Sequence, residues 1–109
     1  GPDDMAMTTF LSSNGFASWS DYTNARSNYA LSSLLKYHIL RGETQAQDLQ
    51  SGTYHTLYTN HWIEILKNQS GTINIEDENG STPMAMVKTT DINAINGVIH
   101  VISKVLEHN

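Results

Sequence analysis

The stretch Thr90-Asp91-Ile92-Asn93-Ala94-Ile95-Asn96-Gly97-Val98-Ile99-His100-Val101-Ile102-Ser103-Lys104-Val105-Leu106 decides the fold. Its Asn96-Gly97 pair tolerates positive φ better than other residues, so it predicts a tight turn with a structural role. The residues from 97 to 106 are mostly apolar on both alternating faces, which is typical of a strand in the middle of a sheet covered on both sides. His100 in this strand is expected to be a buried, hydrogen-bonded imidazole. The residues from 90 to 95 predict a short helical or turn segment.

The preceding third of the chain is typical of antiparallel β structure. Segments 53–59 and 61–67 are rich in aromatic and β-branched residues, and the loop at 68–71 has the composition that joins two strands of a hairpin. Within 72–76, apolar and polar residues alternate, which predicts one buried and one solvent-exposed face. A further strand is expected at 84–88, after a turn rich in acidic residues.

The first forty residues predict one clear helix. Apolar-face residues recur at i, i+3, i+4 and i+7 over 28–40, at Leu31, Leu34, Leu35 and His38. A histidine on such a face is expected to be buried and hydrogen-bonded to the backbone. Before this helix, the β-prone run at 8–11 predicts a short strand, followed by a helical turn at 16–19.

Three segments resemble, in the same order, the conserved boxes of fasciclin (FAS1) domains. The stretch at 90–106 resembles the C-terminal signature of that family: an Asp-Ile turn, then Asn-Gly-Val-Ile-His and a terminal Lys-Val-Leu. Leu34-Leu35-Lys36-Tyr37-His38-Ile39-Leu40 is similar to the central Leu-Leu-x-Tyr-His element. Thr9-Phe10-Leu11-Ser12-Ser13-Asn14-Gly15-Phe16 resembles the first box, although its Pro and Ala are missing. The helical segment that normally precedes this box is absent from the 109 residues.

The resemblance implies an α+β fold, a wedge of two β-sheets flanked by short helices, here truncated at the N-terminus. We expect a single domain over residues 3–109, because Gly1-Pro2 is typical of the remnant of a removed expression tag. In animal members, partner contacts are assigned to the Asp-Ile turn and the Tyr-His region. Transferred by position, the adhesion residues would be Asp91, Ile92, Tyr37 and His38, whereas Asn96, Gly97 and His100 would hold the fold together.

Composition excludes several classes of partner. The net charge is −5 with only six Lys plus Arg, so neither nucleic acid nor an anionic membrane surface is an expected partner. No apolar run is long enough to span a bilayer, so membrane insertion by this domain is not expected. The chain has no cysteine, which excludes disulfides and thiolate metal sites.

Enzyme chemistry has no support in the sequence, and no catalytic residue, cofactor or metal is expected. There is no nucleophile elbow, phosphate-binding glycine loop or dinucleotide fingerprint. The candidate transition-metal ligands have spacings that match no standard site: His55, His61, His108 and Glu64. The aromatic residues Trp62, Tyr54 and Tyr58 are expected either to fill the core or to meet a sugar or protein partner.

The sequence and its resemblance together predict an adhesion or binding module that is secreted or held at a cell surface, with or without a lipid anchor. Its partner would be a matrix or receptor protein or a surface glycan. The alternative is a structural or assembly role. In that case, the domain would self-associate or bind another chain through the surface left open by the missing N-terminal segment.

Overall fold

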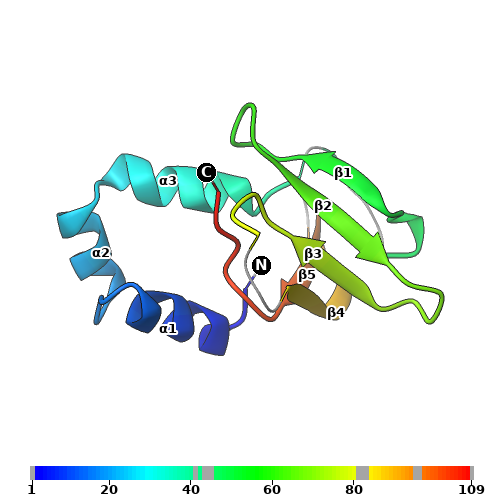
Figure 1. Cartoon of the computed structure of the whole chain (residues 1–109), viewed down its shortest axis with the longest axis horizontal. Coiled ribbons are helices and arrows are strands. Elements are labelled where there is room, and N and C mark those ends of the chain that lie inside the picture. Colours follow the sequence, from blue (N-terminus) through cyan, green and yellow to red (C-terminus); the bar gives the residue numbers. More distant parts are fainter. Residues whose placement is uncertain (1, 41, 43–45, 81–83, 95–96, 109) are drawn as a thin grey trace.

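The computed structural model describes residues 2–40, 42, 46–80, 84–94 and 97–108 of the chain. The helices gather on one side of the molecule and the strands on the other, and the C-terminal tail runs between them (Figure 1). In chain order the elements are α1 (Asp4–Ser13), α2 (Trp19–Ala25), α3 (Asn28–Tyr37), the short 3₁₀ helix η1 (Ala46–Asp48), β1 (Gly52–His55), β2 (Trp62–Lys67), β3 (Ile73–Glu76), β4 (Ala85–Ala94) and β5 (Gly97–Ile102).

Each α-helix begins at a polar N-cap. The cap side chain accepts a hydrogen bond from the backbone N–H three residues further on: Asp3 caps α1, Ser18 caps α2 and Ser27 caps α3. Such a cap satisfies one of the N–H groups that the first turn of a helix leaves unpaired. The helix predicted over 28–40 is confirmed, although it ends earlier, at Tyr37.

Two predictions for the N-terminal region are wrong. The expected strand at 8–11 lies inside α1, because the Asp3 cap starts a helix whose Leu11 is buried among the other helices. Tertiary burial here overrides the local β propensity of the two threonines. The helical turn expected at 16–19 forms later, as α2 from Trp19 onward, since Ser18 supplies the cap.

The five strands form one antiparallel sheet in the order β1-β2-β3-β4-β5. The hairpin predicted around 68–71 is confirmed as the pairing of β2 with β3. Strand β4 pairs first with β3, through Ala85 and Met86, and then with β5, with register shifts on either side of Thr89. The α+β fold class is confirmed, and the two sheets of the expected wedge are two parts of one sheet that share β4.

Strand β5 lies at the end of this strand order, so the prediction of a central strand is wrong. Its outer side meets the N-terminus instead: Pro2 bridges Ile102 in parallel, and the Asp3 amide donates to the Ile102 carbonyl (3.0 Å). The strand ends at Ile102; Ser103 still bonds to Met86 of β4, the chain bends at residues 103–104, and residues 105–108 form an irregular tail. The tail turns away because Val105 and Leu106 are buried in two different cores.

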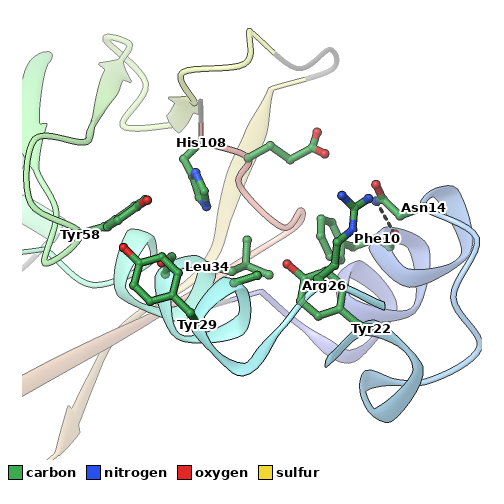
Figure 2. A pocket seen from close by; sticks show the side chains of 11 residues that line it. Phe10, Asn14, Tyr22, Arg26, Tyr29, Leu34, Tyr58 and His108 are labelled. Atoms are coloured by element: carbon green, nitrogen blue, oxygen red, sulfur yellow. Dashed lines mark hydrogen bonds between the residues drawn. The ribbon is translucent and has the colours of Figure 1, made fainter. Parts of the chain in front are cut away.

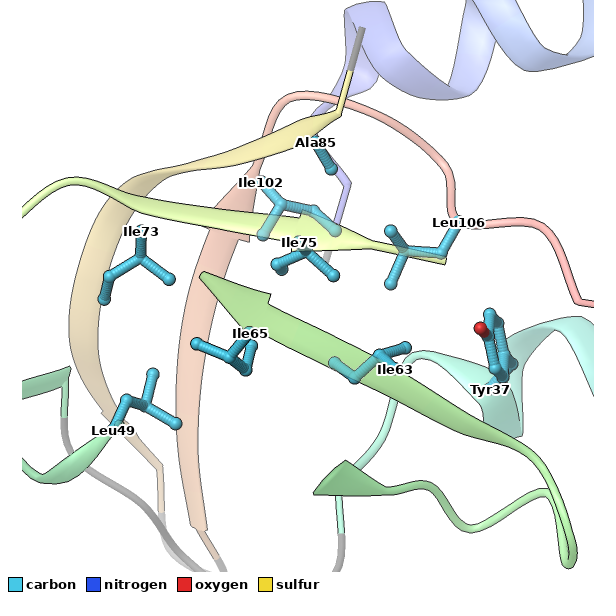
Figure 3. Close-up of a cluster of buried hydrophobic side chains, with 9 residues drawn as sticks. All are labelled: Tyr37, Leu49, Ile63, Ile65, Ile73, Ile75, Ala85, Ile102 and Leu106. Carbon is cyan, nitrogen blue, oxygen red and sulfur yellow. The ribbon is translucent and has the colours of Figure 1, made fainter. Parts of the chain in front are cut away.

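Two hydrophobic cores are joined by the tail. The first lies under the inner face of the sheet, where Ile63 and Ile65 of β2 gather with Ile73 and Ile75 of β3 (Figure 3). Its other buried members come from α3, the connections, β4, β5 and the tail: Tyr37, Leu49, Ala85, Ile102 and Leu106. The second core lies among the helices and contains Ala6, Leu11, Tyr22, Leu34 and Val105.

Candidate binding site

Tyr37 is the most deeply buried aromatic residue, with none of its surface exposed. Its hydroxyl donates to the Trp62 carbonyl (2.8 Å) and accepts from the Glu78 amide (3.0 Å). Burial is the main reason that the pKa of Tyr37 is raised well above its ordinary value, so the hydroxyl stays protonated. This side chain ties α3 to β2 and to the turn after β3, and a partner cannot reach it in the folded domain.

His38 links α3 to the C-terminal tail. Its Nε2 accepts from the Leu106 amide (2.8 Å), so Nδ1 carries the proton and donates to the Leu34 carbonyl (2.7 Å). The imidazole is therefore neutral, and burial is the main reason that its pKa is lowered. The expected hydrogen bonds of this imidazole to the backbone are confirmed, although the residue is half-buried and not fully buried.

We expect the domain to lose stability as the pH falls below about 6.5, the ordinary pKa of histidine. Because the folded-state pKa of His38 is lower than this value, the unfolded chain binds more protons in that window. The contribution of His38 is fully present above 6.5 and is lost as the pH falls through the folded-state pKa. Urea unfolding across this range checks the prediction. A His38→Gln variant should show a shallower pH dependence, and an unchanged slope would contradict this origin.

A cluster of histidines and tyrosines surrounds the Tyr37 anchor. His61 Nδ1 lies 2.6 Å from Glu78 Oε1, and the Tyr58 ring stacks on His61 with ring centres 4.0 Å apart. The His108 ring packs edge-on against both, at 4.8 Å from Tyr58 and 5.4 Å from His61. The cluster fixes the tail and the β1–β2 connection against α3.

The four residues considered as metal ligands do not come together. His61 and His108 are neighbours, but His55 packs against Trp62, and the Glu64 carboxylate accepts from the Thr53 hydroxyl (2.8 Å). Within the ranges that the structure describes, no group of three or more His, Cys, Asp or Glu residues could hold a metal ion.

The face of the sheet opposite the first core is open. Side chains alternate along β2, so Trp62 and Leu66 are exposed on this face while Ile63 and Ile65 are buried. Trp62 is 46% exposed, whereas Tyr54 and Tyr58 pack against the core. The three aromatic residues therefore separate, with Trp62 on the open face and Tyr54 and Tyr58 packed against the core.

Carboxylates occupy the middle of this open face. Glu64 of β2 lies directly opposite Glu76 of β3, and like charges in that position destabilise a sheet. With Thr53, Trp62 and residues 77–78 they line a groove of about 390 Å³. The nearest basic residue along β2, Lys67, donates to the Leu49 carbonyl (3.1 Å).

A second hollow lies between the helices and the C-terminal tail (Figure 2). This cleft has a volume of about 360 Å³. Tyr29, Tyr58 and His108 lie toward one end of it and Arg26 and Asn14 toward the other (Figure 2). The remaining lining residues are Phe10, Tyr22, Ala30, Ser33, Leu34 and Glu107. No sequence motif marks the cleft; the available signal was Arg26, the first basic residue along the chain.

The expected Asp91-Ile92 turn is a strand. Both residues lie in β4, where Ile92 pairs with Ile99 of β5. The prediction of a helical or turn segment at 90–95 is wrong for residues 90–94, because pairing with β5 satisfies their backbone groups. Residue 95 lies outside the described part of the chain.

The structure describes two of the three other signature positions, Gly97 and His100. Asn96 lies outside the described residues, so the predicted turn at 96–97 is not described. Gly97 begins β5 opposite Ala94, and His100 lies in the same strand, half-buried.

Within the described residues, three α-helices and a short 3₁₀ helix followed by a five-stranded antiparallel meander define a small α+β domain. The fasciclin domain model matches residues 2–108, and the chain belongs to the fasciclin domain family. Fasciclin domains are generally adhesion or protein-interaction modules, and they are typically extracellular or associated with a surface.

The chain is also similar to a solved structure, a FAS1 domain pair from the insect cell adhesion molecule fasciclin I. The TM-score is 0.68 with 18% sequence identity, and the match covers 96% of this chain and 34% of the other. At this identity the likeness shows the fold alone, and the chain spans about a third of that relative. No curated protein matches the chain. None of the described helices has both the length and the apolar character needed to cross a membrane.

Proposed function

We propose that this single domain, over residues 3–109, is an extracellular or cell-surface adhesion module that binds a protein partner through the open face of its sheet. The observation that carries this proposal is the exposed Trp62 beside Glu64 and Glu76, two carboxylates that face each other across neighbouring strands. The partner would present a basic segment to this face.

The composition of the face supports a protein partner. An open antiparallel sheet face is ordinarily polar, yet this one exposes Trp62, Leu66 and Met86. Leu66 and Met86 lie in one cross-strand row, each opposite Asn74. Tryptophan and methionine are enriched in protein interfaces, where tryptophan often contributes most of the binding free energy.

The charge of the face selects the kind of partner. A Lys or Arg side chain placed between Glu64 and Glu76 would remove their repulsion, and its cation could also lie over the Trp62 ring. A feature that destabilises the free domain but favours a basic partner fits a binding role better than a structural one. The net charge of −5 would also speed association with such a partner.

Surface plasmon resonance with an immobilised Arg- and Lys-rich peptide tests the proposal. We expect Trp62→Ala to weaken binding by about tenfold. The Glu64→Gln/Glu76→Gln double variant should also bind more weakly, while its free energy of unfolding rises by a few tenths of a kcal/mol. Leu57→Ala, an exposed leucine in the β1–β2 connection, is the matched control.

Two results would contradict this proposal. One is unchanged peptide binding by both variants. The other is equal binding of a peptide in which every Arg and Lys is replaced by Gln. Asp91 and Ile92, which the family resemblance assigns to partner contacts, remain a second proposed contact on β4, and an Asp91→Ala variant tests it by attachment to matrix-coated surfaces.

A further inference from the structure

The cleft in Figure 2 is separate from the open sheet face, and unlike the acidic groove of that face it contains an arginine. Its volume of about 360 Å³ falls in the range of small-ligand pockets, and its lining combines aromatic rings with polar and charged side chains. We infer that the cleft is a second binding site, for a sugar unit that carries a carboxylate, such as a hexuronate of an acidic glycan.

Arg26 supplies the recognition of a negative charge. Within the described part of the chain, neither the His61–Glu78 nor the Lys88–Asp3 ion pair involves Arg26, and its guanidinium forms no salt bridge with a described carboxylate. Its guanidinium lies 5.7 Å from the centre of the Phe16 ring. Guanidinium groups bind carboxylates with two parallel hydrogen bonds, which gives both affinity and a fixed orientation.

The helices fix the backbone position of Arg26 before any ligand binds. Arg26 is the C-cap of α2, and its amide donates to the Tyr22 carbonyl (2.8 Å). The Tyr22 ring packs against Phe10, Phe16 and Trp19, with ring centres 5.4 to 6.0 Å apart. A preformed wall of this kind lowers the entropic cost of binding.

The opposite end of the cleft suits a sugar ring. Tyr29 is 71% exposed, so a ring face is available for the C–H groups of a pyranose. Tyr58, which lines the same cleft, is held by stacking on His61. Asn14 donates its side-chain N–H to the Phe10 carbonyl (2.8 Å), which leaves its oxygen as an acceptor for a hydroxyl. Glu107 also lines the cleft; its carboxylate accepts from the Asn79 side chain (3.4 Å), and a carboxylate can accept further hydrogen bonds from sugar hydroxyls, which a simple anion would lack.

Titration of the domain with three small probes, followed by amide NMR shifts, tests the inference. Methyl β-glucuronide should shift the amides of residues that line the cleft, whereas methyl β-glucoside, which lacks the carboxylate, should bind about tenfold more weakly. Acetate, which lacks the ring, should also be weaker than the glucuronide. Arg26→Gln should lower affinity for the glucuronide to that for the glucoside, and Tyr29→Ala should weaken both sugars. Lys36→Gln removes a positive charge from α3 outside the cleft lining and should change nothing.

Three outcomes would overturn the inference. They are the absence of shifts at the cleft with the glucuronide, equal affinity for glucuronide and glucoside, and acetate binding as strong as that of the glucuronide. Acetate binding of that strength would mean that the cleft recognises a bare carboxylate, as on an acidic peptide. Peptide binding by the sheet face is measured separately, so the failure of one site leaves the other standing.

Discussion

Replacing Tyr37 by alanine should lower the free energy of unfolding by about 3–5 kcal/mol, a large part of what a domain of this size has. The ring fills the contact between α3 and the sheet with none of its surface exposed. Its removal leaves a cavity beside Ile63 and Leu106, the near neighbours in Figure 3. It also leaves the partly buried Glu78 amide without its acceptor. Urea unfolding followed by tryptophan fluorescence measures the loss.

A conservative variant separates the contribution of the Tyr37 ring to stability from that of its hydroxyl. Tyr37→Phe keeps the packing but removes the bonds to the Trp62 carbonyl and the Glu78 amide, so we expect a loss of about 1–3 kcal/mol. Tyr29→Ala removes an exposed tyrosine and should change stability by less than about 0.5 kcal/mol. A Tyr37→Phe variant as stable as the parent would show that the two hydrogen bonds contribute nothing net.

The second large effect is expected at Leu106, which attaches the tail to the first core. Leu106→Ala should cost about 2–5 kcal/mol, because the side chain is buried among the isoleucines of β2 and β3. The exposed Leu57 gives the matched control, since Leu57→Ala removes the same atoms from the surface and should cost little.

The Leu106 variant also reports on the cleft. Residues 107 and 108 line it, so a loosened tail should weaken glucuronide binding together with stability. Hydrogen exchange at the Leu106 amide, which donates to His38, should accelerate by more than at amides of β2. Equal acceleration everywhere would mean that the tail opens only when the whole domain unfolds.

The sequence predicts most of the elements whose hydrophobic pattern is local. Alternation over 72–76 and the turn residues at 68–71 specify the β2–β3 hairpin, and the apolar spacing over 28–40 specifies α3. The run at 8–11 wrongly predicts a strand, because the β propensity of these residues contributes less free energy than the packing of Leu11 between the helices. The position of β5 at the sheet edge depends on contacts with residues 2–3, about a hundred residues earlier, which no local pattern reveals.

Local sequence patterns likewise predict some features of the candidate sites, whereas others depend on contacts between distant segments. Alternation along β2 indicates that Trp62 and Glu64 share a face, but only the fold shows that nothing within the described chain covers it. Tyr37 bonds to groups 25 and 41 residues away, so its structural role could be taken from the family resemblance but not from spacing. The cleft is assembled from three helices, the β1–β2 connection and the tail, and no single segment carries its pattern.

The two hydrogen bonds of His38 make its imidazole equivalent to one additional peptide group. Its Nδ1–H reaches the carbonyl four residues earlier, as a backbone amide in the next turn of α3 would, and its Nε2 accepts a backbone amide as a carbonyl would. The imidazole thereby links the backbone hydrogen bonds of α3 to the backbone of the tail, two segments far apart in the sequence. A replacement side chain must offer a donor and an acceptor on opposite sides of one rigid ring, and no other natural side chain does so.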